Sequence, residues 1–321
     1  MILILSQEND KSTDDVIDWI HHIEGSCLRI NSGDLYFNNV IKINSTSDSF
    51  KILNFNIHDI NIVWMRRFHN IEYYTNSLFD DSEVKGIIDV KRSLNYESNA
   101  ISDYFLSIFS KKKWLTKHKQ AYVDKLIALD IAQKLGIDIP NTLISSEINE
   151  IEKFYSTFKK IISKPLSNCE LIMYGGNYYS NYTSEVNFEE LLNSKRIPLT
   201  LFQENLDKEF EIRVFYFFGQ CYSMAIFSQS DEKTKTDFRI YNFDKPNRNV
   251  PYKLEEPLLL KIKELMTLLD LDTGSLDFIK TQDGRMVFLE VNPVGQFGMV
   301  SHPCNFYLEK LIANYLIEND I

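Results

Sequence analysis

The sequence has few cysteines and none of the short motifs that mark the commonest cofactor sites. Its four cysteines, Cys27, Cys169, Cys221 and Cys304, lie far apart and form no Cys-x-x-Cys pair. Neither a zinc site nor a disulfide framework is indicated, and a reducing cytosol fits this cysteine usage best. None of the six histidines stands at metal-ligand spacing, and Gly-x-Ser-x-Gly, Gly-x-Gly-x-x-Gly and Walker A patterns are missing. Hydrolase and dehydrogenase functions are therefore weakly supported.

The sequence also lacks long apolar runs and an excess of positive charge. The N-terminus is apolar for only five residues, which is too short for a signal peptide or a membrane span. The net charge of -10 argues against a general nucleic-acid binder, which needs a basic face. We therefore expect a cytoplasmic protein. The run "KKKWLTKHK" at 111–119 is locally basic, and is either a solvated linker or helix start, or a contact for an acidic peptide.

The 321 residues have the composition of a globular protein, and their number predicts two or three domains. Strands alternate with helices at the start, which predicts a small parallel sheet. The predicted segments of this first unit are strands at 1–6, 27–31 and 61–68 and helices at 13–23 and 90–110. The rest of the chain predicts helices at 120–136, 255–271 and 305–319 and strands at 160–166, 199–205, 209–229 and 274–293. A mixed α/β chain of three consecutive units fits this order best.

The stretch "GSLDFIKTQDGRMVFLEVNP" at 274–293 is two apolar runs around Asp283-Gly284, a pair typical of a two-residue hairpin turn. A turn centred there places Asp277 directly opposite Glu290, with Asn292 on the same face. Like charges in that position are destabilising, so we expect something positive between them. Two carboxylates and an amide are oxygen ligands suited to Mg²⁺, which commonly shares its coordination with nucleotide phosphates. The alternative is a hairpin whose polar face simply meets water.

Phosphate-handling lysines are present at suitable places. Lys164 interrupts the predicted strand "KIISKPL" just before a loop, and Lys125 lies near the start of the 120–136 helix. Both could instead be solvated surface lysines. The loop with Gly175-Gly176 could cover phosphates through backbone N–H groups, although two glycines are a weak signal.

The segment "FQENLDKEFEIR" is suited to the other end of a nucleotide. Gln203, Glu204 and Leu206 would lie in a connection between two lobes, where backbone groups and an apolar side chain can contact an adenine. Glu211 can accept hydrogen bonds from ribose hydroxyls, and Arg213 shares its strand face. A solvent-facing strand edge would produce the same Glu-x-Arg pattern.

These motifs, in this order from about residue 115 to 305, resemble those of the ATP-grasp enzymes. "VWMRRF" at 63–68, "TDFR" at 236–239 and "LEVNPVGQFG" at 289–298 look more specifically like the ATP-grasp maturases of graspetides, the microviridin-type peptides. The N-terminal twenty residues are most similar to the maturase of grasp-with-spasm systems. The resemblance implies an ATP-grasp fold of the α/β (α+β) class. Its expected parts are an N-terminal parallel domain at 1–112, a central subdomain at 113–200 and a C-terminal subdomain at 201–321.

The resemblance also implies a reaction and its participants. Such enzymes use ATP and Mg²⁺ to convert an Asp or Glu side chain of a precursor peptide into an acyl phosphate. A Thr or Ser hydroxyl, or a Lys amine, of the same peptide then closes a macrolactone or macrolactam. The peptide's leader is expected to bind a groove of the central subdomain, and related enzymes are typically homodimers.

The roles implied for individual residues follow the motifs. Asp277, Glu290 and Asn292 are expected to hold Mg²⁺, and Lys125 and Lys164 the phosphates. Arg213 and Arg239 are the expected donors to the oxyanion, with Asp237 orienting Arg239 or receiving the hydroxyl proton; without the resemblance, "TDFR" reads as a charged surface loop. Arg66 and Arg67 are expected to border the same cleft, with one of the two pointing away because neighbours on an extended chain alternate.

Two other functions remain open at this point. The first is an ATP-grasp ligase that adds an amino acid to a protein or small carboxylate, and the second is a non-catalytic ATP-binding scaffold. Activity with free amino acids would favour the first, and nucleotide binding without turnover the second.

Overall fold

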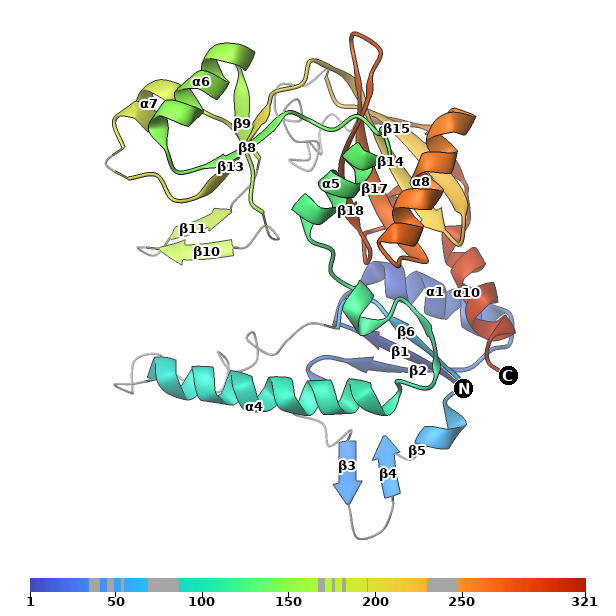
Figure 1. The fold of residues 1–321 in the computed structure, drawn as a ribbon. Helices are drawn as coiled ribbons and strands as arrows, with labels where there is room; N and C mark the ends of the chain where they lie inside the picture. The colour runs from blue at the N-terminus through green and yellow to red at the C-terminus, as the bar shows by residue number, and fades with distance from the viewer. Residues whose placement is uncertain are drawn as a thin grey trace. The chain divides into compact units, whose positions relative to one another are not determined.

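The computed structural model describes residues 1–34, 41–44, 49–52, 55–68, 87–166, 171–174, 177–180, 183–194, 196–229 and 247–321 (Figure 1). The chain divides into two compact units. Unit 1 comprises Met1–Tyr122, Pro293–His302 and Phe306–Ile321, and unit 2 comprises Val123–Asn292 and Pro303–Asn305. Unit 1 is thus assembled from both ends of the chain, and the division into three consecutive domains stays a prediction.

Unit 1 is built on a four-stranded sheet in the order β2-β1-β6-β7. All three strand pairings are parallel, which confirms the sheet predicted from the alternating N-terminal segments. The strands are β1 (Ile2–Ser6), β2 (Cys27–Asn31), β6 (Ile62–Met65) and β7 (Lys113–Leu115). Each residue of β1 is buried, as expected for a central strand covered on both faces.

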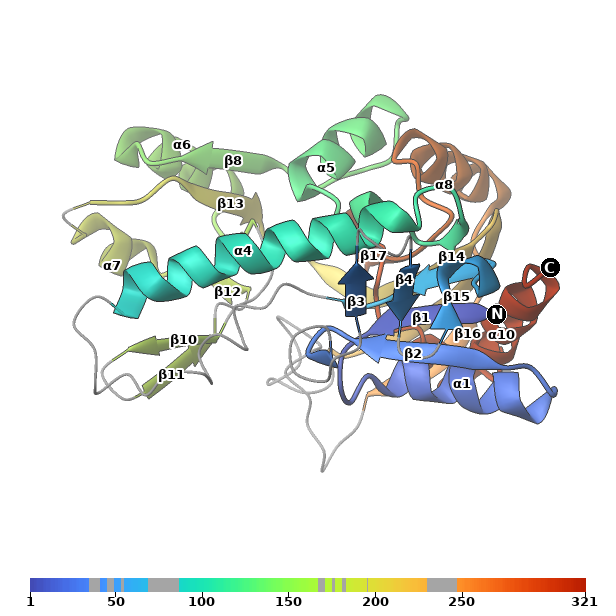
Figure 2. The same ribbon diagram turned by 90° about the horizontal axis from the view of Figure 1, so that it is seen from below.

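Helices cover this sheet. Leu3 and Leu5 of β1 pack with Phe105 of α4 (Ile87–Ile108) and with Phe109 directly after this helix, so alternation directs Ile2 and Ile4 to the other face. In Figures 1 and 2, α1 (Lys11–His22) and the C-terminal α10 (Leu308–Glu318) lie side by side. The remaining described elements of unit 1 are β3 (Ile41–Asn44), β4 (Ser49–Ile52), β5 (Phe55–Asn56), η1 (Ile57–Asp59), η2 (His118–Gln120) and most of α9 (Gly298–Cys304).

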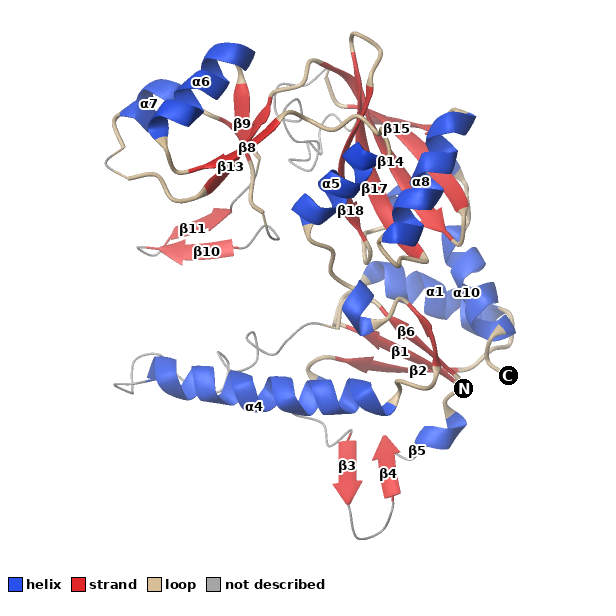
Figure 3. Ribbon diagram, viewed as in Figure 1, coloured by secondary structure: helices blue, strands red, loops and turns tan. Residues whose placement is uncertain are grey.

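Unit 2 contains a five-stranded antiparallel sheet in the order β16-β15-β14-β17-β18. The helices α5 (Lys125–Lys134) and α8 (Glu256–Leu268) cover one of its faces (Figure 3), and a single apolar core joins them to the sheet. Polar residues of the central strands are therefore directed to the opposite face. The strands are β14 (Lys208–Phe217), β15 (Gln220–Phe227), β16 (Arg248–Tyr252), β17 (Thr273–Thr281) and β18 (Met286–Asn292).

Unit 2 also contains a smaller sheet in the order β12-β9-β13-β8, in which each pairing is antiparallel. Its strands and helices are β8 (Thr142–Ser145), α6 (Ile148–Phe158), β9 (Ile161–Ser163), β12 (Ser184–Glu185), α7 (Phe188–Leu192) and β13 (Thr200–Glu204), and β10 (Leu171–Tyr174) pairs separately with β11 (Asn177–Ser180). Residues 205–207 join this sheet to β14, so Leu206 lies in the connection as predicted, whereas Gln203 and Glu204 lie in β13 and not in the connection.

Several elements differ from the sequence-based expectation. Lys164 lies just after β9 rather than within it, and the basic run at 111–119 forms β7 and η2 rather than a linker or helix start. The elements β8, α6, α7, β16 and α9 were not predicted. Among the described residues, no helix is long and apolar enough to cross a membrane.

Candidate active site

Asp277 and Glu290 face each other across β17 and β18, as predicted. The predicted two-residue turn is wrong, however, because Gln282, Asp283 and Gly284 form a three-residue loop between Thr281 and Arg285. Thr281 N donates to the Arg285 carbonyl at 3.0 Å, and Gly284 has a φ of +90°. This shifts the distal pairs by one residue, as in Ile279 opposite Val287.

A bulge in the hairpin restores the pairing of the two acids. Phe278 lies opposite Phe288 while Asp277 lies opposite Glu290, so Leu289 is the extra residue of β18. On a regular strand, Phe288 and Glu290 would lie on the same face because they are two residues apart. The bulge instead places Phe288 in the apolar core and Glu290 on the face of Asp277. The shift at the turn and the shift at the bulge cancel.

Each acid has its own positive partner. Arg213 of β14 lies directly opposite Asp277, with Nη1 3.5 Å from Oδ1. Lys125, the first residue of α5, places Nζ 3.1 Å from Glu290 Oε2. The expected positive charge is thus present as two protein cations, both largely buried. Asn292 Nδ2 donates to Glu290 Oε1 at 3.2 Å, which brings the third predicted metal ligand into the same group.

Glu290 is strongly held in its ionised form. Burial would raise its pKa, but the charges of Lys125 and Lys164, together with hydrogen bonds from Lys125 and Asn292, lower the pKa to about 2. Lys125 also donates to the Pro165 carbonyl at 3.0 Å, so this one ammonium joins β18 to the segment that follows β9. The predicted phosphate lysines therefore act together on one carboxylate.

Glu211 is buried two residues before Arg213, where the sequence placed it. Its Oε1 accepts from Lys208 Nζ at 2.6 Å and its Oε2 accepts from Ser228 Oγ at 2.9 Å. Lys208 was missed, because a residue three positions from Glu211 falls on the opposite face of a regular strand. The pairing of β14 with β17 is irregular between Lys208 and Phe210, and this brings Lys208 to the side of Glu211.

The connection between the two sheets of unit 2 has well-defined contacts. Gln203 is buried in β13, and its Nε2 donates to Thr142 Oγ1 at 2.9 Å. Glu204 Oε1 accepts from the backbone and side-chain nitrogens of Asn141 at 2.9 and 3.0 Å. Leu206 is half-buried in the connection itself. The Glu204 carboxylate therefore fixes the start of β8, and what this segment can offer a ligand is mainly its backbone.

In unit 1, Arg66 and Arg67 contact the segment that follows Asn292. Arg66 is buried, with its guanidinium 5.1 Å from the centre of the Phe297 ring and Nη1 3.3 Å from the Gly295 carbonyl. Burial lowers the pKa of Arg66 to about 10, although the negative charge of Asp10 acts to raise it. Arg67 donates to the side-chain oxygen of Gln296 at 3.0 and 3.2 Å.

Both arginines contact the same segment, and the expectation that one of them points away from the cleft stays a prediction. The strand β6 ends at Met65, so the alternation of side chains no longer applies to the two residues after it. Asp237, Arg239 and Gly175-Gly176 lie outside the described residues, and their predicted roles stay predictions.

Known structures resemble the chain over its whole length, whereas no protein-family model and no curated protein matches its sequence. A RiPP-associated ATP-grasp ligase of Chryseobacterium gregarium, solved with ADP and a leader and core peptide, has a TM-score of 0.81 and 23% identity, covering 99% of this chain and 96% of that chain. The macrocyclase MdnC of Microcystis aeruginosa MRC, bound with precursor peptide MdnA, has a TM-score of 0.80 and 24% identity over 99% of both chains. The chain has the ATP-grasp fold.

A third ATP-grasp ligase extends this comparison to a metal-containing complex. PsnB, solved with a phosphomimetic variant of its minimal precursor, Mg and ADP, has a TM-score of 0.77 and 13% identity over 100% of this chain and 98% of that chain. At these identities the likeness establishes the ATP-grasp architecture, which confirms the predicted fold. In this ATP-grasp chain, the candidate site is the polar face of β14, β17 and β18 with the start of α5.

Proposed function

We propose that this chain is an ATP-dependent ligase that closes rings in a ribosomally made precursor peptide. The observation that carries the proposal is the paired acids Asp277 and Glu290, with Arg213 and Lys125 beside them, in a chain that matches solved peptide macrocyclases end to end. This acid and base cluster is what phosphoryl transfer requires, because that reaction depends mostly on positioning and charge neutralisation.

In the proposed reaction, ATP supplies the γ-phosphoryl group that converts an Asp or Glu side chain of the peptide into an acyl phosphate. A Thr or Ser hydroxyl, or a Lys amine, of the same peptide attacks the acyl carbon, and phosphate leaves with one oxygen of the original carboxylate. The peptide loses one water mass for each ester or amide formed. Macrolactones or macrolactams are the products.

The donor set fits Mg²⁺, because two carboxylates and an amide are hard oxygen ligands. We assign Asp277, Glu290 and Asn292 as its ligands, where the ion would neutralise phosphate charge. With a pKa of about 2, Glu290 is ionised at neutral pH, so a metal ion held there would replace the ammonium of Lys125 and would release no proton. Lys125 and Lys164 then become available to phosphate oxygens.

Arg213 is the described residue best suited to an oxyanion. It is buried and held against Asp277, so little reorganisation is needed when negative charge develops beside it. Arg239 is proposed as a second donor, with Asp237 orienting it or receiving the hydroxyl proton, on the resemblance of the "TDFR" motif alone.

For the nucleotide, we propose that the backbone of Gln203 and Glu204 and the side chain of Leu206 contact the adenine. Glu211 is proposed to accept from the ribose hydroxyls. Its two oxygens accept from Lys208 and Ser228, which hold the carboxylate in a fixed position on β14.

Other features of the proposal concern the chain as a whole. We propose three functional parts at 1–112, 113–200 and 201–321, a leader-binding groove in the second, a homodimer and a cytoplasmic location. Light scattering of the purified chain tests the dimer.

The described cysteines are unpaired, and burial raises the pKa of the Cys27 and Cys221 thiols to about 11, so neither is suited to nucleophilic chemistry.

An amino-acid ligase of the ATP-grasp type is the alternative with the same site. It predicts ATP consumption with free amino acids, whereas a macrocyclase needs a peptide that carries a leader. A non-catalytic scaffold predicts nucleotide binding without turnover. The Glu290 group favours an enzyme, because ionisable groups with shifted pKa values concentrate at functional sites.

Mass spectrometry of a precursor peptide encoded beside this gene tests the proposal, after incubation with the protein, ATP and Mg²⁺. We expect loss of one water mass per ring with the wild type and no loss with Asp277→Asn or Glu290→Gln. Glu264→Gln, an exposed substitution on α8, is the matched control and should keep full activity. An unchanged peptide, with ATP consumed when free amino acids are added, would replace the macrocyclase by the amino-acid ligase.

A further inference from the structure

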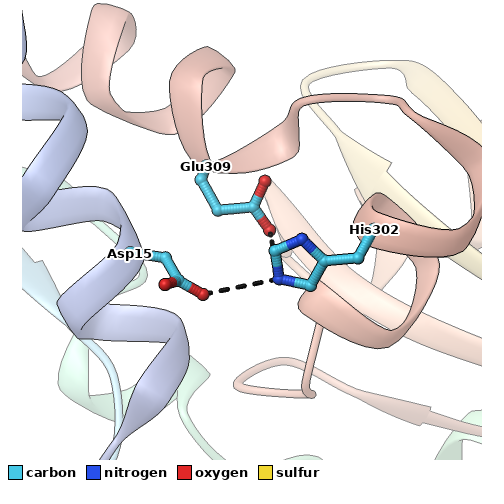
Figure 4. A group of neighbouring side chains, drawn as sticks. All are labelled: Asp15, His302 and Glu309. Atoms are coloured by element: carbon cyan, nitrogen blue, oxygen red, sulfur yellow. Dashed lines mark ion pairs between the residues drawn. The ribbon is translucent and has the colours of Figure 1, made fainter.

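Unit 1 contains a cluster of ionisable side chains that the proposed function does not use. Asp15 of α1, His302 of α9 and Glu309 of α10 point toward one another (Figure 4). His302 Nε2 lies 3.5 Å from Asp15 Oδ2 and 3.8 Å from Glu309 Oε1, and the three ligand atoms lie within 4.8 Å of one another. Asp15 lies far from His302 and Glu309 in the sequence, so the spacing of metal-binding residues along the chain could not reveal this group.

Glu309 shows that this is more than a surface ion pair. The residue is 4% exposed, and Oε1, the oxygen that points to His302, has no hydrogen-bond partner. Its other oxygen, Oε2, accepts from Ser301 Oγ at 2.6 Å, and Ser301 Oγ in turn accepts from the Leu308 backbone N–H at 2.9 Å. The carboxylate is therefore fixed in place with one buried oxygen unsatisfied, which is costly unless something binds it.

Because Gly298 has no side chain, it leaves space beside His302 Nε2 and Glu309 Oε1. A Cβ at this position would lie 3.4 Å from His302 Nε2 and 3.8 Å from Glu309 Oε1. These are ordinary van der Waals separations, so alanine can be accommodated, but its methyl group would occupy the volume next to the nitrogen and the oxygen. Asp15 Oδ1 is paired with Lys11 on the same helix, so Oδ2 is the oxygen nearer to His302.

We propose that Asp15, His302 and Glu309 bind a divalent transition-metal ion of the Zn²⁺ type. One imidazole nitrogen with two carboxylate oxygens favours such an ion over Mg²⁺ or Ca²⁺, which prefer oxygen alone. At Zn–ligand distances of about 2.0–2.1 Å, two ligands of a tetrahedral ion are about 3.3 Å apart. The two separations from His302 Nε2, 3.5 and 3.8 Å, need to shorten only slightly, and the carboxylate oxygens of Asp15 and Glu309, within 4.8 Å of each other, need to approach further.

The ion would have a structural role. Its ligands come from α1, α9 and α10, so binding would tie the C-terminal part of the chain to the N-terminal helix. His302 is 62% exposed, which leaves a path for the ion and positions for water. A ligand that binds only the folded state stabilises it, and Zn²⁺ should therefore raise the unfolding temperature.

Calorimetric titration of chelator-treated protein with ZnCl₂, in excess Mg²⁺ and without nucleotide, tests the site. We expect one Zn²⁺ per chain in the wild type and at least about 100-fold weaker binding in His302→Gln, since loss of a ligand should exceed the effect of altering a residue that supports one. His21→Gln removes another exposed histidine of unit 1 and should bind as the wild type does. Gly298→Ala changes no charge and should weaken binding about tenfold by filling the space beside the ligands.

Thermal unfolding gives a second readout that is independent of enzyme activity. Zn²⁺ should raise the unfolding temperature of the wild type and His21→Gln but not that of His302→Gln, whose exposed position makes it a mild substitution. No Zn²⁺ binding by the wild type, or equal binding by His302→Gln, would overturn the proposal and leave the three side chains as an ion-pair cluster.

Discussion

At the scale of single residues, Glu290 carries the strongest electrostatic effect of the candidate site. Its carboxylate is removed from water yet lies beside two lysines, so its charge is held by the protein itself. The sequence predicted that two facing acids need a positive partner, and that physical expectation is confirmed by Lys125 and Arg213. The identity of these partners could not be predicted, because they come from α5 and β14, whose positions depend on the tertiary fold.

Glu290 should make stability depend on pH. Its pKa falls from 4.5 in the unfolded chain to about 2, so the stabilisation is complete above pH 4.5 and is lost as the pH falls toward 2. The full change corresponds to about 3 kcal/mol of unfolding free energy. Urea unfolding of wild type and Glu290→Gln, from neutral pH downward, should show a stability difference that shrinks below about pH 4.5. A difference that stays constant across the acid range would contradict this account, and Glu264→Gln should show no such trend.

Arg213 should act on the chemical step more than on ATP binding. Arg213→Ala should lower kcat for peptide dehydration about 10²–10³-fold, the usual cost of losing one oxyanion donor. Arg213→Lys keeps the charge beside Asp277 but loses the planar fork, so an intermediate kcat is expected. Rates at saturating ATP and peptide, with the Kd of ATP from calorimetry, separate the two effects. An unaltered kcat in Arg213→Ala would remove this arginine from the mechanism, and exposed Arg285→Ala serves as the control.

At the scale of secondary structure elements, irregular strands place the polar groups. Both the bulge at Leu289 and the irregular pairing near Lys208 change which face a side chain occupies. Sequence periodicity predicted the strands and the pairing of Asp277 with Glu290, but periodicity has no signal for an inserted residue. The pairing was correct because two shifts cancelled, whereas the side of Lys208 could not have been predicted at all.

The loop of the β17–β18 hairpin should be sensitive to its glycine. Gly284 has a φ of +90° and no neighbouring atom within 4 Å of an added Cβ, so Gly284→Ala costs only backbone strain. A loss of about 1 kcal/mol in unfolding free energy is expected. Gly284→Asn should lose less, because asparagine tolerates positive φ better than alanine does. Equal urea midpoints for the alanine variant and the wild type would show that the loop relaxes freely.

The N-terminus of α5 connects helix capping to the site. The Asp124 side chain accepts from the backbone N–H groups of Leu126 and Ile127 at 2.8 and 3.1 Å, and Lys125 lies between Asp124 and Leu126 in sequence. Asp124→Ala should cost about 1 kcal/mol of stability and weaken ATP binding by freeing the first turn that carries Lys125.

Two control variants separate capping from general effects on this helix. Asp124→Asn keeps a capping side chain and should restore most of both losses. Asp130→Ala removes only an exposed ion pair with Lys134 and should change stability by a few tenths of a kcal/mol. Unchanged ATP affinity in Asp124→Ala would show that the helix cap does not contribute to nucleotide binding.

At the scale of the whole molecule, the order of strands and helices was enough to predict an α/β chain with a parallel N-terminal sheet. It could not show that α10 belongs with that sheet, because the association joins residues from opposite ends of the chain. The group of Asp15, His302 and Glu309 escaped sequence reasoning for the same reason. The elements α7 and β16 have five residues each, too few for a clear period, whereas α6 carries Ile148, Ile151 and Phe154 at helical spacing and could have been predicted.

If a peptide carboxylate is activated as an acyl phosphate, one of its oxygens must leave with phosphate, and oxygen-isotope transfer detects this. A precursor peptide labelled with ¹⁸O in its Asp and Glu carboxylates would be incubated with the protein, ATP and Mg²⁺. We expect ADP as the nucleotide product and one ¹⁸O atom in phosphate for each ring closed. Ring closure with the label in AMP, or ATP consumption with unlabelled phosphate, would contradict this mechanism.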